Sequence, residues 1–286
     1  MISFPNCKIN IGLNIIQKRP DGYHDIETIF LPVPLSDILE VIPASDNSNP
    51  FNLEVTGIAV DCAPEKNLCV RSYQLLQKEY NLPPADIHLH KVIPSGAGLG
   101  GGSSDAAFML KMLSKLFNLC LSEDELCNLA STLGSDCAFF IKNRALFGYG
   151  RGNLFHETTG LTYPVKIVII HPGINVSTAE AYASITPRRP ETGIEELIQQ
   201  DISKWKDTLK NDFEEPVFQK YPQIRKIKEM LYEHGAVYAS MSGSGSAVYG
   251  LFTENMPPSA EMFPGMFYYS SSIISVPLGR QSPTAT

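Results

Sequence analysis

The sequence predicts an α+β fold with two lobes. Segments with a strand pattern and segments with a helix pattern follow one another without the regular βαβ rhythm of a doubly wound sheet. An irregular stretch near residues 185–195, rich in proline, arginine and threonine, is suited to join two lobes. A length of 286 residues fits two modest lobes that share a cleft. We expect the lobes to be residues 1–160 and 161–286.

The individual elements follow from the spacing of apolar residues, which is two in strands and three to four in helices. The expected strands are residues 2–16, 26–31, 37–42, 52–56, 87–93 and 165–170, with a turn at 20–24. The expected helices are residues 67–80, 103–116 and 122–133, with a mainly helical stretch at 191–234 and a strand–glycine loop–strand pattern at 236–252. Ser-x-x-Glu capping boxes at 122–125 and 177–180 each mark the start of a helix. The small, polar tail after Pro277 is expected to fray.

Composition and charge exclude several classes of function. A net charge of −7 argues against nucleic acid or an anionic membrane as a partner. No apolar run approaches the ~20 residues of a membrane span, and the N-terminus lacks a secretory signal pattern. The six cysteines form neither a C-x-x-C pair nor a zinc-type cluster, which predicts reduced, mostly buried thiols. We therefore expect a cytoplasmic protein with a small-molecule substrate, present as a monomer or a weak homodimer.

The segment Pro94-Ser-Gly-Ala-Gly-Leu-Gly-Gly-Gly-Ser-Ser-Asp105 carries the strongest functional signal. Glycine gives the backbone access to positive φ and leaves no Cβ in the way of a ligand. The segment leads directly into a helix, whose first N–H groups are unpaired and partly positive. Such a junction is suited to bind phosphate. The hydroxyls of Ser103 and Ser104 can cap the helix or contact a phosphate oxygen or a cation.

Other phosphate-binding loops fit this segment less well. Gly96, Gly98 and Gly101 satisfy G-x-G-x-x-G, but a dinucleotide site also needs an acidic residue after a second strand about 20 residues on, where a helix begins at Ser122. A Walker loop needs Gly-Lys-Ser/Thr after its glycines, and no lysine follows here. The lysine and catalytic-loop signatures of protein kinases are also missing.

Two further segments narrow the interpretation of the glycine loop at residues 96–102. Lys8-Ile-Asn10 is followed by the turn Asp21-Gly-Tyr-His24, and Met241-Ser-Gly-Ser-Gly-Ser246 lies between two apolar strands. Together with the central loop, they resemble the three motifs of the GHMP kinase superfamily. Lys8-Ile-Asn10 and Asp21-Gly-Tyr-His24 are most similar to one family within it, which phosphorylates the 2-hydroxyl of a cytidylyl-linked methylerythritol in the non-mevalonate isoprenoid route. Other similar segments are Pro94 to Ala107, Gly134-Ser-Asp136, Gly148-Tyr-Gly-Arg-Gly152 and Pro172 to Tyr182.

The resemblance implies a two-lobed GHMP kinase fold, with ATP and substrate meeting in the cleft between the lobes. It also implies a divalent cation, normally Mg²⁺, whose ligands we leave unassigned. Asp136 matches the catalytic base, and Lys8 matches the partner that keeps this carboxylate ionised and offsets developing negative charge. Spacing alone would also allow Asp136 to be a solvated acid at a helix C-terminus and Lys8 to be a surface lysine.

The resemblance also implies which residues bind the two substrates. Tyr23 and Tyr182 would flank the cytosine and His24 would read its edge, although a core aromatic and an exposed turn histidine are the alternatives. The residues expected to hold the diphosphate or erythritol oxygens, or to close over the phosphates or the substrate, are Asn10, Thr178, Ser242, Gly243 and Ser244. The residues expected around ATP are Pro94, Ser95, Gly96, Ala97, Gly98, Leu99, Gly100, Gly101, Gly102, Ser103, Ser104 and Asn67, the last near the adenine or acting as a helix N-cap.

The chain departs from the family pattern in two places. Gly134-Ser-Asp-Cys-Ala138 stands where the family usually has Gly-Ala-Asp-Val-Pro, and Asn153 replaces a glutamate. Two other functions stay open: a GHMP kinase for homoserine, mevalonate or a sugar, and a non-catalytic nucleotide-binding sensor on the same fold.

Overall fold

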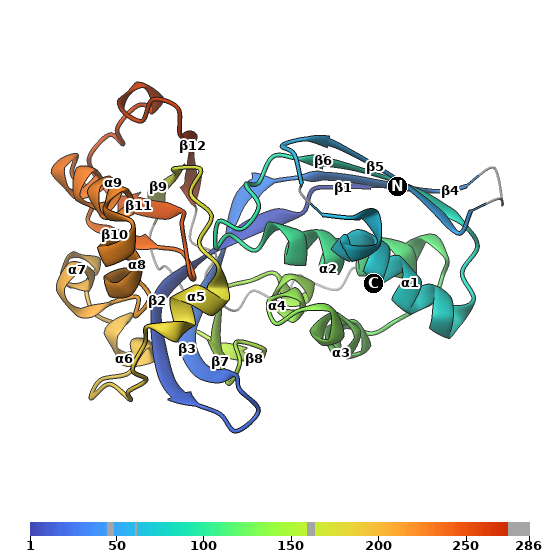
Figure 1. Ribbon diagram of the computed structural model, residues 1–286, viewed down its shortest axis with the longest axis horizontal. Helices are drawn as coiled ribbons and strands as arrows, with labels where there is room; N and C mark the ends of the chain where they lie inside the picture. Colours follow the sequence, from blue (N-terminus) through green and yellow to red (C-terminus); the bar gives the residue numbers. More distant parts are fainter. Residues whose placement is uncertain (45–48, 61, 159–163, 274–286) are drawn as a thin grey trace, which may run out of the picture.

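The computed structural model describes residues 1–44, 49–60, 62–158 and 164–273. The strands of these residues form three four-stranded sheets, and helices pack against the first and the third (Figure 1). The mixture of helices and largely antiparallel sheets confirms the α+β class. The expected lobe boundary at 160/161 and the tail after Pro277 lie outside the described residues, so both stay predictions.

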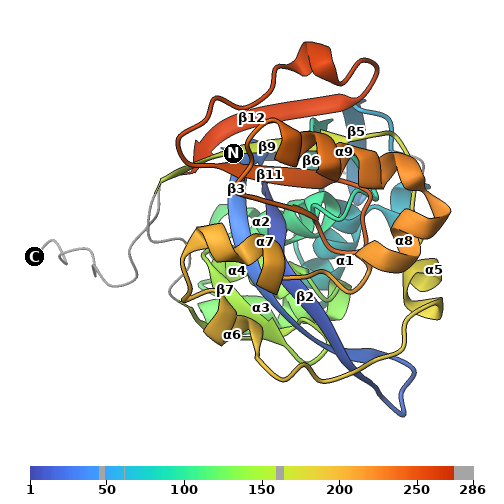
Figure 2. The same ribbon diagram turned by 90° about the vertical axis from the view of Figure 1, so that its left-hand side faces the viewer.

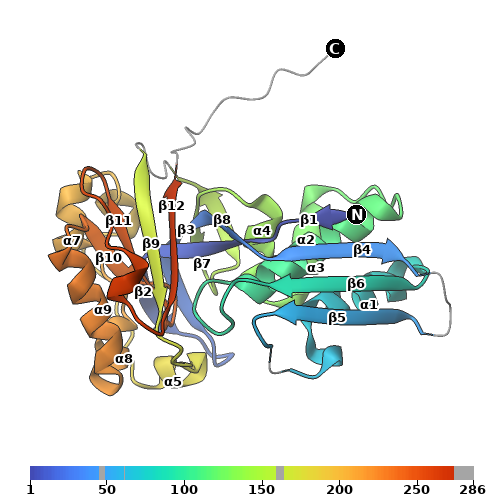
Figure 3. The same cartoon turned by 90° about the horizontal axis from the view of Figure 1, so that it is seen from above.

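The first sheet belongs to the N-terminal lobe. In spatial order its strands are β1 (Ile2–Ser3), β4 (Ile38–Pro43), β6 (Ala85–Lys91) and β5 (Phe51–Gly57). The helical elements on its inner side are η1 (Pro64–Lys66), α1 (Leu68–Tyr80), α2 (Gly101–Leu116), α3 (Glu123–Leu133) and α4 (Cys137–Lys142). Figure 3 looks onto this sheet with the helices behind it. Every second residue of β6 is buried, because one face of the sheet packs on these helices.

The second sheet lies between the lobes. Its strands, in spatial order, are β2 (Asn6–Lys18), β3 (His24–Ser36), β7 (Leu146–Tyr149) and β8 (Leu154–Glu157). β2 and β3 form a long antiparallel hairpin around the turn expected at residues 20–24 (Figure 1). β3 continues through Pro32 and Pro34, although the sequence predicted its end at residue 31. Proline lacks an N–H, and both prolines lie beyond residues 28–30, the part of β3 that pairs with β7.

The third sheet belongs to the C-terminal lobe. In spatial order its strands are β10 (Tyr238–Met241), β11 (Val248–Phe252), β9 (Val165–His171) and β12 (Phe267–Ile273), all antiparallel. The helical elements of this lobe are α5 (Thr178–Ala183), α6 (Ile194–Leu197), η2 (Ile202–Lys204), α7 (Trp205–Thr208), α8 (Glu214–Lys220), α9 (Pro222–Glu233) and η3 (Ala260–Met262). Figure 2 shows α8 and α9 on the outer side of the sheet. The mainly helical stretch and the strand–loop–strand pattern are thus confirmed.

A buried apolar core joins the hairpin of the second sheet to the third sheet. It includes Ile9 and Ile11 of β2, Trp205 of α7 and Tyr249 of β11, all 0–1% exposed. The Tyr249 hydroxyl also donates to the backbone carbonyl of Asn10, 2.7 Å away. Fully burying a large apolar side chain contributes roughly 1.5–3 kcal/mol. This core therefore fixes β2 against the C-terminal lobe and sets the geometry between the lobes.

One predicted capping box forms and the other does not. The Ser122 hydroxyl accepts from the Glu125 N–H, and the Glu125 carboxylate accepts from the Ser122 N–H. Ser177 does precede α5, but its side chain makes no capping bond. The second capping box was therefore wrong, because the Glu180 carboxylate accepts hydrogen bonds from Lys220 and Tyr221 instead.

The cysteines match the prediction of reduced, mostly buried thiols only in part. All six thiols are free; Cys7, Cys69 and Cys137 are buried, whereas Cys62 and Cys120 are exposed, so the expectation of mostly buried thiols holds only in part. None of the helices in the described ranges combines the length and the apolar run that crossing a bilayer requires.

Candidate active site

A cavity of about 910 Å³ lies where the two lobes and the β2–β3 hairpin meet. Its walls come from four parts of the chain that are far apart in sequence: the hairpin, the first glycine loop (residues 94–100), the turn at residues 135–136 and the segment 175–187. Gly243 and Ser244 of the second glycine loop (residues 242–247), together with Arg151 and Phe213, complete the lining. The motifs that the sequence singled out are thus gathered around one space.

The first glycine loop adopts backbone conformations that favour glycine. Gly96, Gly98 and Gly100 all have positive φ, and Gly100 is the N-cap of α2. Helix α2 begins at Gly101, two residues before the predicted start, so the last two glycines are already helical. The free amides of the first turn of α2 and of the loop therefore form a compact donor set, of the kind that binds phosphate.

The two glycine loops touch one another. The Ser242 hydroxyl donates to the Gly98 carbonyl at 2.8 Å, and the Ala247 N–H donates to the Ala97 carbonyl at 3.0 Å. A Cβ added at Gly98 would lie 1.9 Å from the Ser242 carbonyl oxygen. Only glycine permits this approach, so the second loop holds the first in its conformation.

Lys8 and Asp136 face one another beside these loops. The Lys8 ammonium, on the buried strand β2, lies 3.4 Å from the Asp136 carboxylate. It also donates to Asn10 Oδ1 at 2.6 Å and to the Gly98 carbonyl at 2.9 Å. The Lys8 side chain is 4% exposed, whereas that of Asp136 is 31% exposed. A buried cation thus orients a carboxylate that opens into the cavity.

Asp136 lies in the turn between two helices. It follows α3, whose C-cap is Gly134, as the sequence predicted, and it precedes α4, which the sequence did not predict and which begins at Cys137. Asp136 is the N-cap residue of α4, and its side chain makes no capping hydrogen bond. Its carboxylate is therefore free of the usual capping role and remains available to a ligand.

Aromatic rings gather at the other end of the cavity. The Tyr182 ring stacks on the His24 ring, with centroids 4.5 Å apart and planes at 13°, and meets the edge of Phe213. The Arg151 guanidinium lies over the exposed Tyr23 ring, 4.7 Å from its centroid. Burial, with the negative charge of Asp136, raises the pKa of Tyr182 to about 12. Burial, together with the nearby Lys18 cation, lowers the pKa of His24, so its ring is neutral at pH 7.

Polar side chains connect the two ends. The buried Asn10 amide donates to the Thr28 hydroxyl at 3.1 Å, while its oxygen accepts from Lys8. Thr178, at the start of α5, lies within hydrogen-bond distance of Ser244, with 3.2 Å between the hydroxyl oxygens. One end of the cavity thus has the Lys8–Asp136 pair and the free backbone amides of the first glycine loop and the first turn of α2, which we call the phosphate cradle. The other end has the stacked aromatic rings.

Comparison with known proteins identifies the family. A model described as "GHMP kinases N terminal domain" matches residues 67–144, and one described as "GHMP kinases C terminal" matches residues 194–260. A protein of Bacteroides thetaiotaomicron is 55% identical over 252 residues, which are 88% of this chain and 92% of that one, and is named 4-diphosphocytidyl-2-C-methyl-D-erythritol kinase. The chain belongs to the 4-diphosphocytidyl-2-C-methyl-D-erythritol kinase family. Membership in this kinase family implies ATP as the phosphoryl donor and a small molecule as the acceptor.

A further relative and two solved structures are consistent with this family and this fold. A Chlorobium phaeobacteroides protein of the same name is 40% identical over 86% of this chain and 84% of its own length. A crystal structure of 4-(cytidine 5'-diphospho)-2C-methyl-D-erythritol kinase, 30% identical, superposes with a TM-score of 0.79 over 95% of this chain and 98% of that one. A mevalonate kinase of Methanococcus jannaschii, 16% identical, has a TM-score of 0.68 over 96% and 98%, a likeness that concerns the fold alone. The predicted GHMP kinase fold is confirmed.

Not every residue expected from the kinase family lines the cavity. Of the expected ATP-binding residues, Gly96, Gly98 and Gly100 do so. The Asn67 side chain accepts from the Cys69 N–H at 2.9 Å and thus caps α1. The Ser104 hydroxyl is buried and has no partner among the described residues. The remaining members of the expected ATP-binding set stay predictions; they are Pro94, Ser95, Ala97, Leu99, Gly101, Gly102 and Ser103. The substrate-binding role expected for Ser242, which does not line the cavity, stays a prediction as well.

Three residues of the cavity with charged or amide side chains were not predicted from the sequence. Lys18, Arg151 and Asn175 line it, but none had been given a role. Arg151 stands within Gly148-Tyr-Gly-Arg-Gly152 and Asn175 within Pro172 to Tyr182, two segments that did carry the resemblance. Reading each polar residue of those segments as a ligand candidate would have found both.

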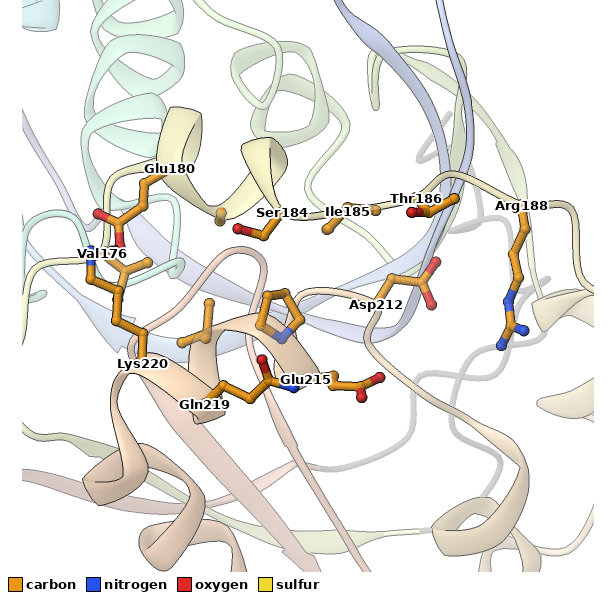
Figure 4. A pocket seen from close by; sticks show the side chains of 13 residues that line it. Val176, Glu180, Ser184, Ile185, Thr186, Arg188, Asp212, Glu215, Gln219 and Lys220 are labelled. Carbon is orange, nitrogen blue, oxygen red and sulfur yellow. Dashed lines mark hydrogen bonds and ion pairs between the residues drawn. The ribbon is translucent and has the colours of Figure 1, made fainter.

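A second cavity, of about 880 Å³, lies on the other side of α5 (Figure 4). α5 separates the two spaces: Tyr182 lines the first and Glu180 the second. The Glu180 carboxylate accepts from the Lys220 ammonium at 2.5 Å and from the Tyr221 hydroxyl at 3.2 Å. Its hydrogen bond with Lys220 lowers the pKa of Glu180. These contacts tie α5 to the end of α8, across the second cavity.

Proposed function

We propose that this chain transfers the γ-phosphoryl group of ATP to the 2-hydroxyl of 4-diphosphocytidyl-2-C-methyl-D-erythritol, in the non-mevalonate pathway to isoprenoid precursors. The proposal includes a cytoplasmic location and a monomer or weak homodimer. The observation that carries it is the Lys8–Asp136 pair, 3.4 Å apart, beside a glycine loop in one cavity. Family membership supports it, because relatives with this name share about half of their residues with the chain.

The ATP phosphates would bind to the first glycine loop and the first turn of α2. Their negative charge is favoured there by the free amides and by the helix dipole. Gly96, Gly98 and Gly100 leave the backbone uncovered toward the cavity. Asn67 stays a proposal for the adenine end, since its side chain also serves as a helix cap.

Phosphoryl transfer requires alignment, charge stabilisation and a proton acceptor. Asp136 would take the proton of the substrate hydroxyl as that oxygen forms its bond to the γ-phosphorus. The bond from the γ-phosphorus to the bridging oxygen breaks, and ADP leaves with that electron pair. The Lys8 ammonium, already held by Asn10 and Gly98, would offset the charge that develops on the transferring group.

The cytidylyl end of the substrate would lie among the aromatic rings. Tyr182 offers a ring whose position Phe213 supports, and Tyr23 offers an exposed face. The neutral His24 ring has both a donor and an acceptor for the edge of the base. Asn10, Thr178 and the second glycine loop, Ser242 to Ser244, would contact the diphosphate and erythritol oxygens.

A divalent cation fits this site as an ion carried mainly by ATP. Mg²⁺ is usually held by one or two protein oxygens together with substrate phosphates. The described residues contain no cluster of three or more His, Cys, Asp or Glu side chains able to hold a metal ion. The Asp136 carboxylate, which lines the cavity beside the first glycine loop, is an oxygen that suits it. When bound, the ion would neutralise phosphate charge.

A panel of acceptors tests the proposal. Purified protein should release ADP with ATP and the cytidylyl methylerythritol at a kcat/KM at least 10²-fold above that with mevalonate or homoserine, because the aromatic end has no counterpart in the smaller alcohols. The assay couples ADP release to NADH oxidation, with phosphorus NMR of the product. A preference for mevalonate, homoserine or a sugar would favour another GHMP kinase, and tight ATP binding without turnover would favour a sensor.

Loosening α5 should weaken binding of the cytidylyl substrate. We expect Glu180→Gln to raise KM for that substrate by about 2–5-fold, a modest effect because solvent screens an exposed ion pair. The KM for ATP and kcat should change by less than about twofold, because Glu180 acts through the position of Tyr182. Steady-state kinetics with each substrate varied in turn measures both effects.

Two further variants make this comparison specific. Glu215→Gln, on α8 at the other wall of the second cavity, should leave both KM values unchanged. The charge reversal Glu180→Lys with Lys220→Glu should restore much of the binding. An unchanged KM in Glu180→Gln would show that α5 does not need this anchor.

A further inference from the structure

Three buried charged residues form a cluster beneath the first glycine loop. The Lys91 ammonium donates to a carboxylate oxygen of Asp37 and, at 2.7 Å, to Asp105 Oδ2. All three side chains are at most 3% exposed. None of them lines the cavity, so the proposed chemistry leaves the cluster without a role.

The cluster joins the two ends of the loop. Lys91 is the last residue of β6, before the loop, and Asp105 lies in the second turn of α2, after it. The bond between them closes a stretch of 14 residues. Asp37, between β3 and β4, adds to this closure, since its other oxygen accepts from the N–H groups of Val92 at 2.6 Å and Ile93 at 2.8 Å.

The start of α2 packs closely against the residues around Lys91. A Cβ added at Gly101 would lie 2.9 Å from the Ile93 side chain and 3.4 Å from the Lys91 ammonium. The lysine therefore packs directly under the first residue of α2. Any change in its position moves the amides that line the cradle.

Stability alone gives no reason for this arrangement. Burial, partly offset by Lys91 and reinforced by Asp37, raises the pKa of Asp105 from 3.8 to about 7. The buried Cys69 thiol of α1 also faces it. Because the folded state holds a proton that the unfolded chain releases, the contribution of Asp105 to stability falls as pH rises from about 4 to about 7. The ionised cluster, with one net negative charge and an Asp105 Oδ1 that has no partner in the described residues, is thus costly above pH 7.

We propose that Asp37, Lys91 and Asp105 are a clamp that holds both stems of the first glycine loop at the spacing an ATP triphosphate requires, with Asp105 as a positioning residue. This inference rests on the proposed function, because it takes the loop to be the triphosphate site. The clamp acts before ATP arrives: it fixes the amides in place, so that binding does not have to order them.

Asp105→Asn tests the clamp with little change in shape. The amide oxygen still accepts from the Lys91 ammonium, but the attraction between two opposite charges is lost. We expect the Kd of a non-hydrolysable ATP analogue and the KM for ATP to rise about 3–10-fold, with KM for the cytidylyl substrate within twofold of the parent. The midpoint of thermal unfolding at pH 8 should equal or exceed that of the parent, because a costly buried charge is removed.

A purely structural role predicts the opposite pattern. Leu76→Ala, in the fully buried core of the same lobe, serves as the matched control, since it lowers stability without contact to the loop. An unchanged analogue Kd in Asp105→Asn would overturn the inference. So would a rise in KM for both substrates together with a lowered unfolding midpoint, if Leu76→Ala behaved in the same way.

Hydrogen exchange gives a readout that does not depend on catalysis. Amides of residues 95–104 should exchange faster in Asp105→Asn than in the parent, while those of α9 should not change. Equal exchange in the loop would also overturn the clamp. If the parent itself failed to bind the ATP analogue, the proposed function would fail, whereas the exchange experiment would still decide whether the clamp exists.

Discussion

Asp136→Asn should lower kcat by about 10²–10⁴-fold, the range that general-base assistance usually supplies. The amide has nearly the shape of the carboxylate but cannot accept the hydroxyl proton. KM for ATP should stay within about threefold of the parent, because the glycine amides, which bind the phosphates in this proposal, are left intact. Single-turnover kinetics together with calorimetric binding of an ATP analogue would separate the chemical step from binding.

The position of Asp136 beside Lys8 is the reason for expecting so large a loss of kcat. Asp136 is the carboxylate that lies 3.4 Å from the buried Lys8 ammonium and opens into the cavity. Asp124→Asn, in the first turn of α3, is a suitable control and should retain full activity. An Asp136→Asn enzyme with normal kcat would mean that the proton goes elsewhere.

Gly98→Ala should lower kcat/KM for ATP by roughly 10²-fold. Its new Cβ would lie 1.9 Å from the Ser242 carbonyl oxygen, so the two glycine loops must separate by about 1 Å. A misplacement of that size near the reacting groups costs about 10²-fold. Steady-state kinetics with ATP varied, together with analogue binding, measures the loss.

Positive φ and steric contact can be separated with a second glycine. Gly173 has φ of +74° but open space where a Cβ would stand. Gly173→Ala should therefore lose only the roughly 1–2 kcal/mol of stability that a left-handed conformation costs other residues, with normal kinetics. If Gly98→Ala matched this mild behaviour, the contact between the loops would not matter for ATP.

Local structure could be predicted from the sequence where residues close together in the chain determine it. The glycines of 96–102 predicted a loop before a helix, and Ser122 with Glu125 predicted a capped helix start. The second capping box failed because Glu180 has a distant partner, Lys220, 40 residues away. A pattern of four neighbouring residues does not show that a distant residue competes for the same side chain.

Tertiary contacts determined the parts that the sequence left open. The Ser242–Gly98 bond spans 144 residues, and no periodicity signals it. The short helix α4, which the sequence did not predict, is fixed by burial of Phe139 and Phe140 in the N-terminal core, so the N-cap position of Asp136 was missed. The role of Lys8 came from family resemblance, because only the fold brings it beside Asp136.

A crystal structure with a non-hydrolysable ATP analogue and the cytidylyl methylerythritol would test the central claim most directly. The account predicts the terminal phosphate on the amides of residues 96–102, with the 2-hydroxyl oxygen about 2.6–3.2 Å from the Asp136 carboxylate. A terminal phosphate bound away from those amides, or an Asp136 carboxylate out of reach of the hydroxyl in the ternary complex, would contradict it.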